Sequence, residues 1–384
     1  MYDVLIVGGG PAGLHAAREL ARAGADVVVI EEHATVGEPV HCTGVLAAEA
    51  FDEFGIPSGS ILNTLRTVEF HAPSGERVTH STPRTEAVVV DRARFDADLA
   101  QLAAATGAAI RRGARATSLD VGADGVSIVA GDELLRGRAC LIACGANYAL
   151  QRRAGLGMPR LLLNTAQVEV PAGQLRDVEV HFGSEVAPSG FAWAVPVQRD
   201  RAYVRVGVMC EGDANRHFQR MIDRVAPRWG VDDAARSQPR QKVLPLAPLK
   251  QTYADRVLVL GDAAGLVKPT TGGGIYYSLV SASIAASTVA SALGRGDLSA
   301  PALAEYQRQW RKRLGGELRW QLVLRRIAQR LSDAQISSLF ELARTDGLMP
   351  LLRQTAAFNH HREFIIALLK HPPARRVLFR AALV

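Results

Sequence analysis

Apolar positions in the first thirty residues follow the pattern of a buried strand, then a helix, then a second buried strand. Residues 3–7 (Asp-Val-Leu-Ile-Val) and 26–30 (Asp-Val-Val-Val-Ile) each carry a continuous apolar run, which is typical of a parallel strand covered on both faces. Between them, residues 11–23 carry an alanine-rich helical pattern that ends at Gly24. We therefore predict that the chain opens with a parallel α/β unit.

The same order of elements returns late in the chain. Residues 256–260 (Arg-Val-Leu-Val-Leu) form another apolar run, and the small residues over 275–293 predict a long packed helix. Short alternating segments lie between the two α/β parts and predict an antiparallel sheet. These segments are residues 68–71, 168–170, 178–182, 191–197 and 202–208.

The last part of the chain has a helical pattern. We predict helices over residues 301–384, with breaks near Gly315-Gly316, at residues 347–350 and at Pro372-Pro373. The predicted domains are a discontinuous cofactor domain (1–68, 86–164 and 246–296), a sheet domain for the substrate (69–85 and 165–245) and a C-terminal helical region (297–384).

Glycines follow the first strand at the spacing Gly8-x-Gly10-x-x-Gly13. Gly8 permits a tight turn, Gly10 lets the backbone approach a pyrophosphate, and Gly13 lets the helix pack closely on the strand. Pro11 and Ala12 open the helix, whose N-terminus offers free N–H groups and a positive dipole end. The five residues predict a dinucleotide site.

An acidic residue stands at the tip of the second strand, as a dinucleotide site requires. Glu31 lies 18 residues after Gly13, where a carboxylate can accept hydrogen bonds from an adenosine ribose. Glu32 is adjacent and competes for this role. Because neighbouring strand residues point opposite ways, we prefer Glu31 from its place at the strand end.

A second glycine-rich segment follows the late strand. Gly261 and Asp262 stand at the carboxyl end of that strand, where ligands bind in open α/β sheets. Gly272, Gly273, Gly274 and Ile275 then open the long helix, whose N-terminus favours negative charge on a bound ligand. A helix N-cap is the structural alternative for Asp262.

These segments resemble the flavin motifs of the glutathione-reductase and hydroxybenzoate-hydroxylase type flavoproteins. In those proteins the aspartate corresponding to Asp262 contacts the ribityl and pyrophosphate region. Residues 92–96 (Arg-Ala-Arg-Phe-Asp) resemble their Arg-x-x-Phe-Asp segment, which implies that Arg92 reaches the cofactor; the alternative is a solvated arginine. The resemblance implies FAD and a Rossmann-like FAD-binding domain with an inserted sheet domain.

Two further segments resemble the geranylgeranyl reductase family within that superfamily. Residues 37–44 (Gly-Glu-Pro-Val-His-Cys-Thr-Gly) resemble its Gly-x-Pro-x-x-Cys-x-Gly segment, which implies that Cys42 lies in a loop facing the flavin. Residues 191–196 (Phe-Ala-Trp-Ala-Val-Pro) resemble its aromatic-x-Trp-x-Phe-Pro motif. This match implies that Phe191, Trp193 and Pro196 line the substrate site. The resemblance covers about residues 1–350.

The chain departs from the family pattern in two places. Cys144-Gly145 stands where an Asp-Gly is usual, and Gly207 stands alone where a Gly-x-Gly usually follows the tryptophan motif. These changes leave FAD binding expected and the exact substrate open.

The resemblance implies that reduced FAD saturates carbon–carbon double bonds of a polyprenyl chain or another apolar substrate. A hydride reaches one alkene carbon and a proton the other, and an unactivated alkene needs a positioned acid. Cys42 is the candidate, either as proton donor or as a positioning group; a plain buried thiol is the alternative. Trp193 either lines the lipid tunnel or is sheet core.

Two rival functions stay open. A monooxygenase or halogenase on the same fold would share the FAD segments, and a flavin-binding protein without turnover would share them too. The expected electron donor is NAD(P)H or ferredoxin. The sequence holds no second Gly-x-Gly-x-x-Gly, so a nicotinamide donor would have to bind transiently.

Composition narrows the class further. The chain has 384 residues, 48% apolar and 22% charged, which is ordinary for a globular enzyme. The four cysteines have no metal-ligand spacing, so we expect no metal site and no disulfides. Because the first strand begins at residue 2, we expect no signal peptide and a cytoplasmic location.

The net charge of +7 includes many basic residues between 308 and 330, interleaved with apolar ones. They predict either a basic helix resting on anionic lipid or a surface helix packed on the flavin domain. Nucleic-acid binding has no signature here.

Overall fold

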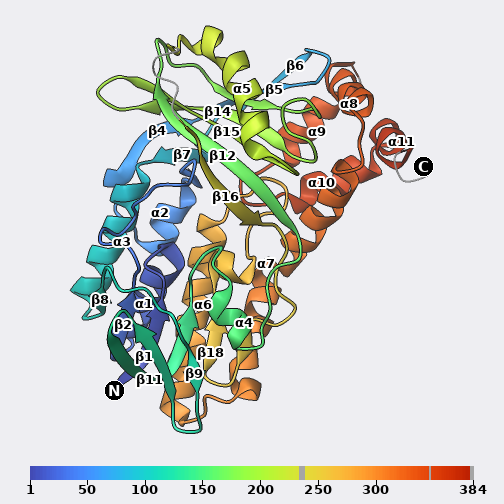
Figure 1. Cartoon of the computed structure of the whole chain (residues 1–384). Coiled ribbons are helices and arrows are strands. Elements are labelled where there is room, and N and C mark those ends of the chain that lie inside the picture. Colours follow the sequence, from blue (N-terminus) through green and yellow to red (C-terminus); the bar gives the residue numbers. More distant parts are fainter. Residues whose placement is uncertain (233–237, 346, 381–384) are drawn as a thin grey trace.

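The computed structural model describes residues 1–232, 238–345 and 347–380, whose strands form three sheets (Figure 1). The eight-stranded sheet is built on five parallel strands in the order β18-β11-β1-β2-β8. Their bounds are Val257–Val259, Glu133–Ile142, Tyr2–Val7, Val27–Ile30 and Ala109–Arg111. The antiparallel strands β9 (Asp120–Val121), β10 (Val126–Ala130) and β17 (Tyr253–Ala254) complete it.

Continuous apolar runs form this sheet, as the sequence predicts. All four residues of β2 and the last four of β1 are buried, because helices cover the sheet. Helices α1 (Pro11–Arg22) and α6 (Ile275–Arg295) pack against each other, and both belong to the main hydrophobic core. The predicted α/β fold with a Rossmann-like parallel sheet is confirmed.

The seven-stranded sheet has the order β16-β12-β15-β14-β13-β5-β6. The bounds in this order are Arg240–Pro245, Leu162–Pro171, Ala202–Cys210, Phe191–Gln198, Val178–His181, Thr67–His71 and Arg77–Ser81. The predicted antiparallel pairing holds for each neighbouring pair except β13 and β5, which run parallel. Helix α5 (Ala214–Trp229) covers one face with a second core (Figure 1).

A three-stranded sheet joins the two larger ones. It consists of β3 (Val45–Ala47), β7 (Ala87–Val90) and β4 (Ile61–Leu65), with α2 (Glu49–Phe54) and the turn η1 (Ser58–Ser60) alongside. Helix α3 (Arg92–Ala105) packs on α1, and α4 (Ala149–Arg153) follows β11. The domain boundaries at residues 68, 86, 164 and 246 stay a prediction.

Five helices form the C-terminal part of the described chain (Figure 1). They are α7 (Ala300–Ala328), α8 (Asp333–Thr345), α9 (Leu348–Thr355), α10 (Arg362–Lys370) and α11 (Pro372–Arg380). The predicted breaks at Gly347 and Pro372 are confirmed, but the one at Gly315-Gly316 is wrong. Helix α7 runs through the pair because Trp310, Leu314 and Leu318 bury one continuous face in the main core.

Burial shows whether the two long helices α6 and α7 pack on the protein core or are free to contact a membrane. By length and composition α6 could cross a membrane, yet 61% of its apolar window is buried inside the protein, as in a core helix. The face of α7 that carries Trp310, Leu314 and Leu318 packs on the core, which favours the packed surface helix over a lipid-bound one.

Candidate active site

The first glycine loop has one glycine that opens toward a cavity and two that fill tight places. Gly8 has φ +111°, and a β-carbon there would overlap the carbonyl of Ala143. A β-carbon on Gly13 would overlap the carbonyl oxygen of Gly8, whereas one on Gly10 would meet no protein atom within 4 Å. The backbone at Gly10 is therefore free to be approached by a ligand.

Glu31 and Glu32 differ in environment at the tip of β2. Glu31 is buried and accepts hydrogen bonds from the backbone N–H groups of Gly9 (2.6 Å) and His33 (2.9 Å). Glu32 is exposed and lies 3.6 Å from the guanidinium of Arg115. Both line the cavity described below, and the ribose role of Glu31 stays a prediction.

The second glycine loop presents Asp262 inside the turn η3 (Gly261–Ala264) rather than at a helix cap. Gly274 is needed there, because a β-carbon would come within 2.5 Å of the Asp262 carboxylate. Burial raises the pKa of Asp262, while the positive charges of Arg92 and Lys242 act in the opposite direction. The Asp262 carboxylate is thus buried at the head of α6, in the positive field of two cations.

A cavity of about 1110 Å³ brings most of the predicted residues together. It is lined by Gly8, Gly10, Pro11, Ala12, Glu31, Glu32, Cys42, Arg92, Asp262, Gly272, Gly273, Gly274, Ile275, Phe191 and Trp193. Gly13, Gly261 and Pro196 do not line it. Gly13 and Gly261 serve close packing, and Pro196 points to the opposite face of β14 because strand neighbours alternate.

The other half of the cavity is apolar. The seven-stranded sheet contributes Phe191, Trp193 and Val180, and the C-terminal helices contribute Phe364 and Ile365. Gly207 explains how the indole fits, since a β-carbon there would overlap the ring of Trp193. The lone glycine of β15 therefore makes room for an aromatic wall.

Cys42 lines the same cavity as the glycine loops and the apolar wall. Its thiol is free and half-buried, and it accepts a hydrogen bond from the N–H of Gly44 at 3.3 Å. Burial acts to lower the pKa of the adjacent Arg92, but the charges of Asp96 and Cys42 outweigh it, so that pKa is raised. The Arg92 side chain is 12% exposed and donates to Asp96 at 2.8 Å, which excludes a solvated arginine.

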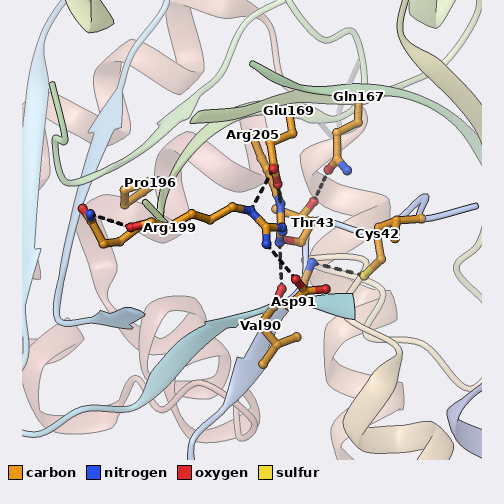
Figure 2. A network of polar contacts seen from close by, with 12 residues as sticks. Cys42, Thr43, Val90, Asp91, Gln167, Glu169, Pro196, Arg199 and Arg205 are labelled. Atoms are coloured by element: carbon orange, nitrogen blue, oxygen red, sulfur yellow. Dashed lines mark hydrogen bonds and ion pairs between the residues drawn. The ribbon is translucent and has the colours of Figure 1, made fainter. Parts of the chain in front are cut away.

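A buried polar network holds the Cys42 loop against the seven-stranded sheet (Figure 2). Arg205 of β15 donates to the carbonyl oxygens of Thr43 (2.6 Å) and Val90 (3.0 Å) and to the carboxylate of Glu169 (2.7 Å). The Thr43 hydroxyl donates to the side-chain oxygen of Gln167 at 2.5 Å. The loop is thereby tied to two neighbouring strands of the sheet, β15 and β12.

A second polar cluster lies on the far side of the same sheet. His71, Glu179 and His181 place their ligand atoms within 4.8 Å of one another. The imidazoles stack at 4.0 Å and 12°, and Arg228 lies 3.0 Å from Glu179. Because a metal binds in the plane of an imidazole, parallel rings suit this ion-pair cluster better than a shared metal.

Comparison with known proteins adds to this geometry. A sequence model of the family described as lycopene cyclase protein matches residues 3–342. The digeranylgeranylglycerophospholipid reductase of Methanocaldococcus jannaschii is 31% identical over 89% of this chain and 90% of its own length.

The chain belongs to the geranylgeranyl reductase family of flavoproteins. A geranylgeranyl bacteriochlorophyll reductase-like protein from Thermoplasma acidophilum has the same fold, with a TM-score of 0.85, 23% identity and 99% of each chain covered. A halogenase solved in complex with FAD covers 99% of this chain and 85% of its own, with a TM-score of 0.68 and 16% identity. This chain, as a member of the geranylgeranyl reductase family, is thus an oxidoreductase with the fold of FAD-dependent flavoproteins.

The residues of the cavity fit an FAD. Gly10 leaves space for a close approach, and the carboxylates of Glu31 and Asp262 stand at its two glycine loops.

Sequence reasoning missed two side chains of this site, Arg205 and Lys242. A signal existed for the first, because Arg205 is a single charge in the apolar run Tyr-Val-Arg-Val-Gly-Val. Lys242 lies on an exposed strand with no sequence feature that sets it apart.

Proposed function

We propose that this protein is an FAD-dependent reductase that saturates carbon–carbon double bonds of a polyprenyl, geranylgeranyl-type lipid. One observation carries the proposal: a single cavity is lined by the glycine loops at Gly10 and Asp262, by an apolar wall and by Cys42. A redox cofactor and a long apolar substrate need this combination. The names of the reductase relatives support the same substrate class.

When bound, reduced FAD supplies the hydride for one alkene carbon. The chain itself then has to bind the lipid, exclude water and supply a proton for the other carbon. Phe191 and Trp193 offer apolar surface for the chain of the substrate, and the C-terminal helices line the same cavity. An alkene packed against these side chains loses contact with water.

We assign the proton to the Cys42 thiol. Its sulfur lies beside the buried guanidinium of Arg92, and that cation stabilises the thiolate that remains after proton transfer. Solvent then returns the proton to the sulfur between turnovers. A positioning role for Cys42 would leave the rate sensitive to the size of the side chain and insensitive to its acidity.

The finer parts of the proposal concern partners. We propose NAD(P)H or a ferredoxin as electron donor, and peripheral contact with a membrane through the basic C-terminal helices from the cytoplasmic side. The donor is tested by anaerobic titration of the oxidised flavoprotein with each reductant. Membrane contact is tested by co-sedimentation with anionic vesicles.

The function is tested by reducing the FAD-loaded protein anaerobically and adding a geranylgeranyl lipid. Flavin reoxidation by the alkene without oxygen supports the reductase, and Cys42→Ala should slow it while Cys42→Ser tests acidity at nearly constant size. Reoxidation by oxygen alone, with no response to the alkene, would favour a monooxygenase. A protein that takes up no FAD would overturn both functions.

A further inference from the structure

The cavity-facing side of the seven-stranded sheet changes from charged to apolar along one row of paired residues. Strand register places Arg240 beside Gln167, Gln167 beside Gly207, and Gly207 beside Trp193. The row continues through Val180 to Phe70. Since strands lie about 4.8 Å apart, it spans about 24 Å from β16 to β5.

The neighbouring row repeats this change. Lys242 pairs with Thr165, Thr165 with Met209, and Met209 with Phe191. Cations therefore occupy the β16 edge in both rows, and aromatic side chains occupy the middle of the sheet. Such a floor suits an amphipathic ligand with an anionic end and a long apolar end.

Lys242 is an exposed cation on β16. Its ammonium makes no hydrogen bond or ion pair within the described ranges, although Lys242 lines the main cavity. Its charge reaches inward, because it acts on the pKa of Asp262 and of His41. A free ammonium facing a cavity is available to an anion.

Arg240 supports the same edge from the adjoining cavity of about 780 Å³. One of its terminal nitrogens donates to the carbonyl oxygen of Val40 at 2.7 Å, which holds the guanidinium beside the Cys42 loop. Three carboxylates line this cavity. Glu169 is engaged by Arg205 and Arg199, Asp91 is engaged by Arg199, and Glu38 is exposed. The cations of β16 are therefore not neutralised by Glu169.

We propose that Lys242 and Arg240 bind the phosphate of an anionic lipid substrate, whose apolar chain crosses the sheet toward Trp193, Val180 and Phe70. The inference rests on the proposed function and names the head-group site that goes with it. The same two cations could bind the phosphate of a nicotinamide donor or of FAD. The test therefore distinguishes three sources of phosphate: the lipid, the donor and the cofactor.

Binding is measured on the oxidised, FAD-loaded protein, so that it does not depend on turnover. The probes are geranylgeranyl diphosphate and geranylgeraniol, which share one apolar chain, and the readout is the change in flavin absorbance on titration. We expect the wild type to bind the diphosphate more tightly than the alcohol. In Lys242→Gln this difference shrinks about tenfold or more, and in Lys242→Gln/Arg240→Gln it disappears.

Lys250→Gln is the matched control, because Lys250 is an exposed lysine that does not line either cavity. It should bind both probes as the wild type does. Equal binding of both probes by the wild type would overturn the head-group site. Weaker FAD binding in Lys242→Gln would assign the cations to the cofactor and overturn the head-group site. Weaker NADPH binding in this variant, with unchanged diphosphate binding, would assign the cations to the electron donor and overturn it too. A protein that passes this test but reduces no alkene would refute the proposed function alone.

Discussion

Arg205 donates a hydrogen bond of 2.6 Å to the backbone carbonyl oxygen of Thr43, the residue that follows Cys42. The two residues are 162 positions apart, so this bond ties the Cys42 loop to the seven-stranded sheet. The Arg205 side chain is 3% exposed, and Glu169 accepts a further hydrogen bond from it. The position of the thiol is therefore set by a residue of the substrate sheet.

Removal of this guanidinium should loosen the loop. We expect Arg205→Met to reduce the free energy of unfolding by about 3 kcal/mol, because buried hydrogen bonds to three oxygens are lost. Alkylation of Cys42 by iodoacetamide, followed by peptide mass mapping, should become faster. Arg201→Met is the control, since Arg201 is an exposed arginine that directly precedes the same strand, β15. Unchanged alkylation of Cys42 in Arg205→Met would show that the loop holds its own shape.

Two glycines of the first loop should respond in opposite ways. Gly10→Ala adds a methyl group to open space, so the fold should keep its stability while FAD affinity falls about a hundredfold. Gly13→Ala forces a methyl group onto the Gly8 carbonyl and should cost about 3 kcal/mol of stability. Thermal unfolding of the apoprotein and fluorescence titration with FAD measure the two effects. Normal FAD affinity in Gly10→Ala would contradict the predicted pyrophosphate position.

Much of this site could be predicted from sequence, because its signals are local. The apolar run of residues 3–7, the spacing Gly8-x-Gly10-x-x-Gly13 and Glu31 lie within thirty residues of each other, so their geometry follows from one strand-turn-helix unit. The bond from Arg205 to Thr43 could not be predicted, since it depends on how two distant segments fold together. Gly315-Gly316 shows the same limit, because helix propensity fails where tertiary burial of Leu314 and Leu318 decides.

Lys268 predicts a pH dependence of stability. Burial lowers its pKa from 10.5 to about 7, and its ammonium donates to the carbonyl oxygen of Phe358 at 2.7 Å. Between pH 7 and 10.5 the unfolded chain binds this proton more tightly than the folded one, so this residue's contribution makes stability rise with pH.

Relative to Lys268→Met, the wild type should gain about 2 kcal/mol between pH 7 and pH 9. Urea unfolding at both pH values measures the difference, and Lys250→Met serves as the exposed control. A constant difference between wild type and Lys268→Met across this range would show that the buried amine does not titrate there.

The central claim is tested most directly by the mass of the product from a single turnover. The FAD-loaded protein is reduced, mixed with geranylgeranyl lipid in the absence of oxygen, and the lipid is extracted for mass spectrometry. The account predicts a lipid that is heavier by two hydrogen atoms for each flavin reoxidised. Unchanged lipid without oxygen, and a lipid heavier by one oxygen atom when air is admitted, would contradict it.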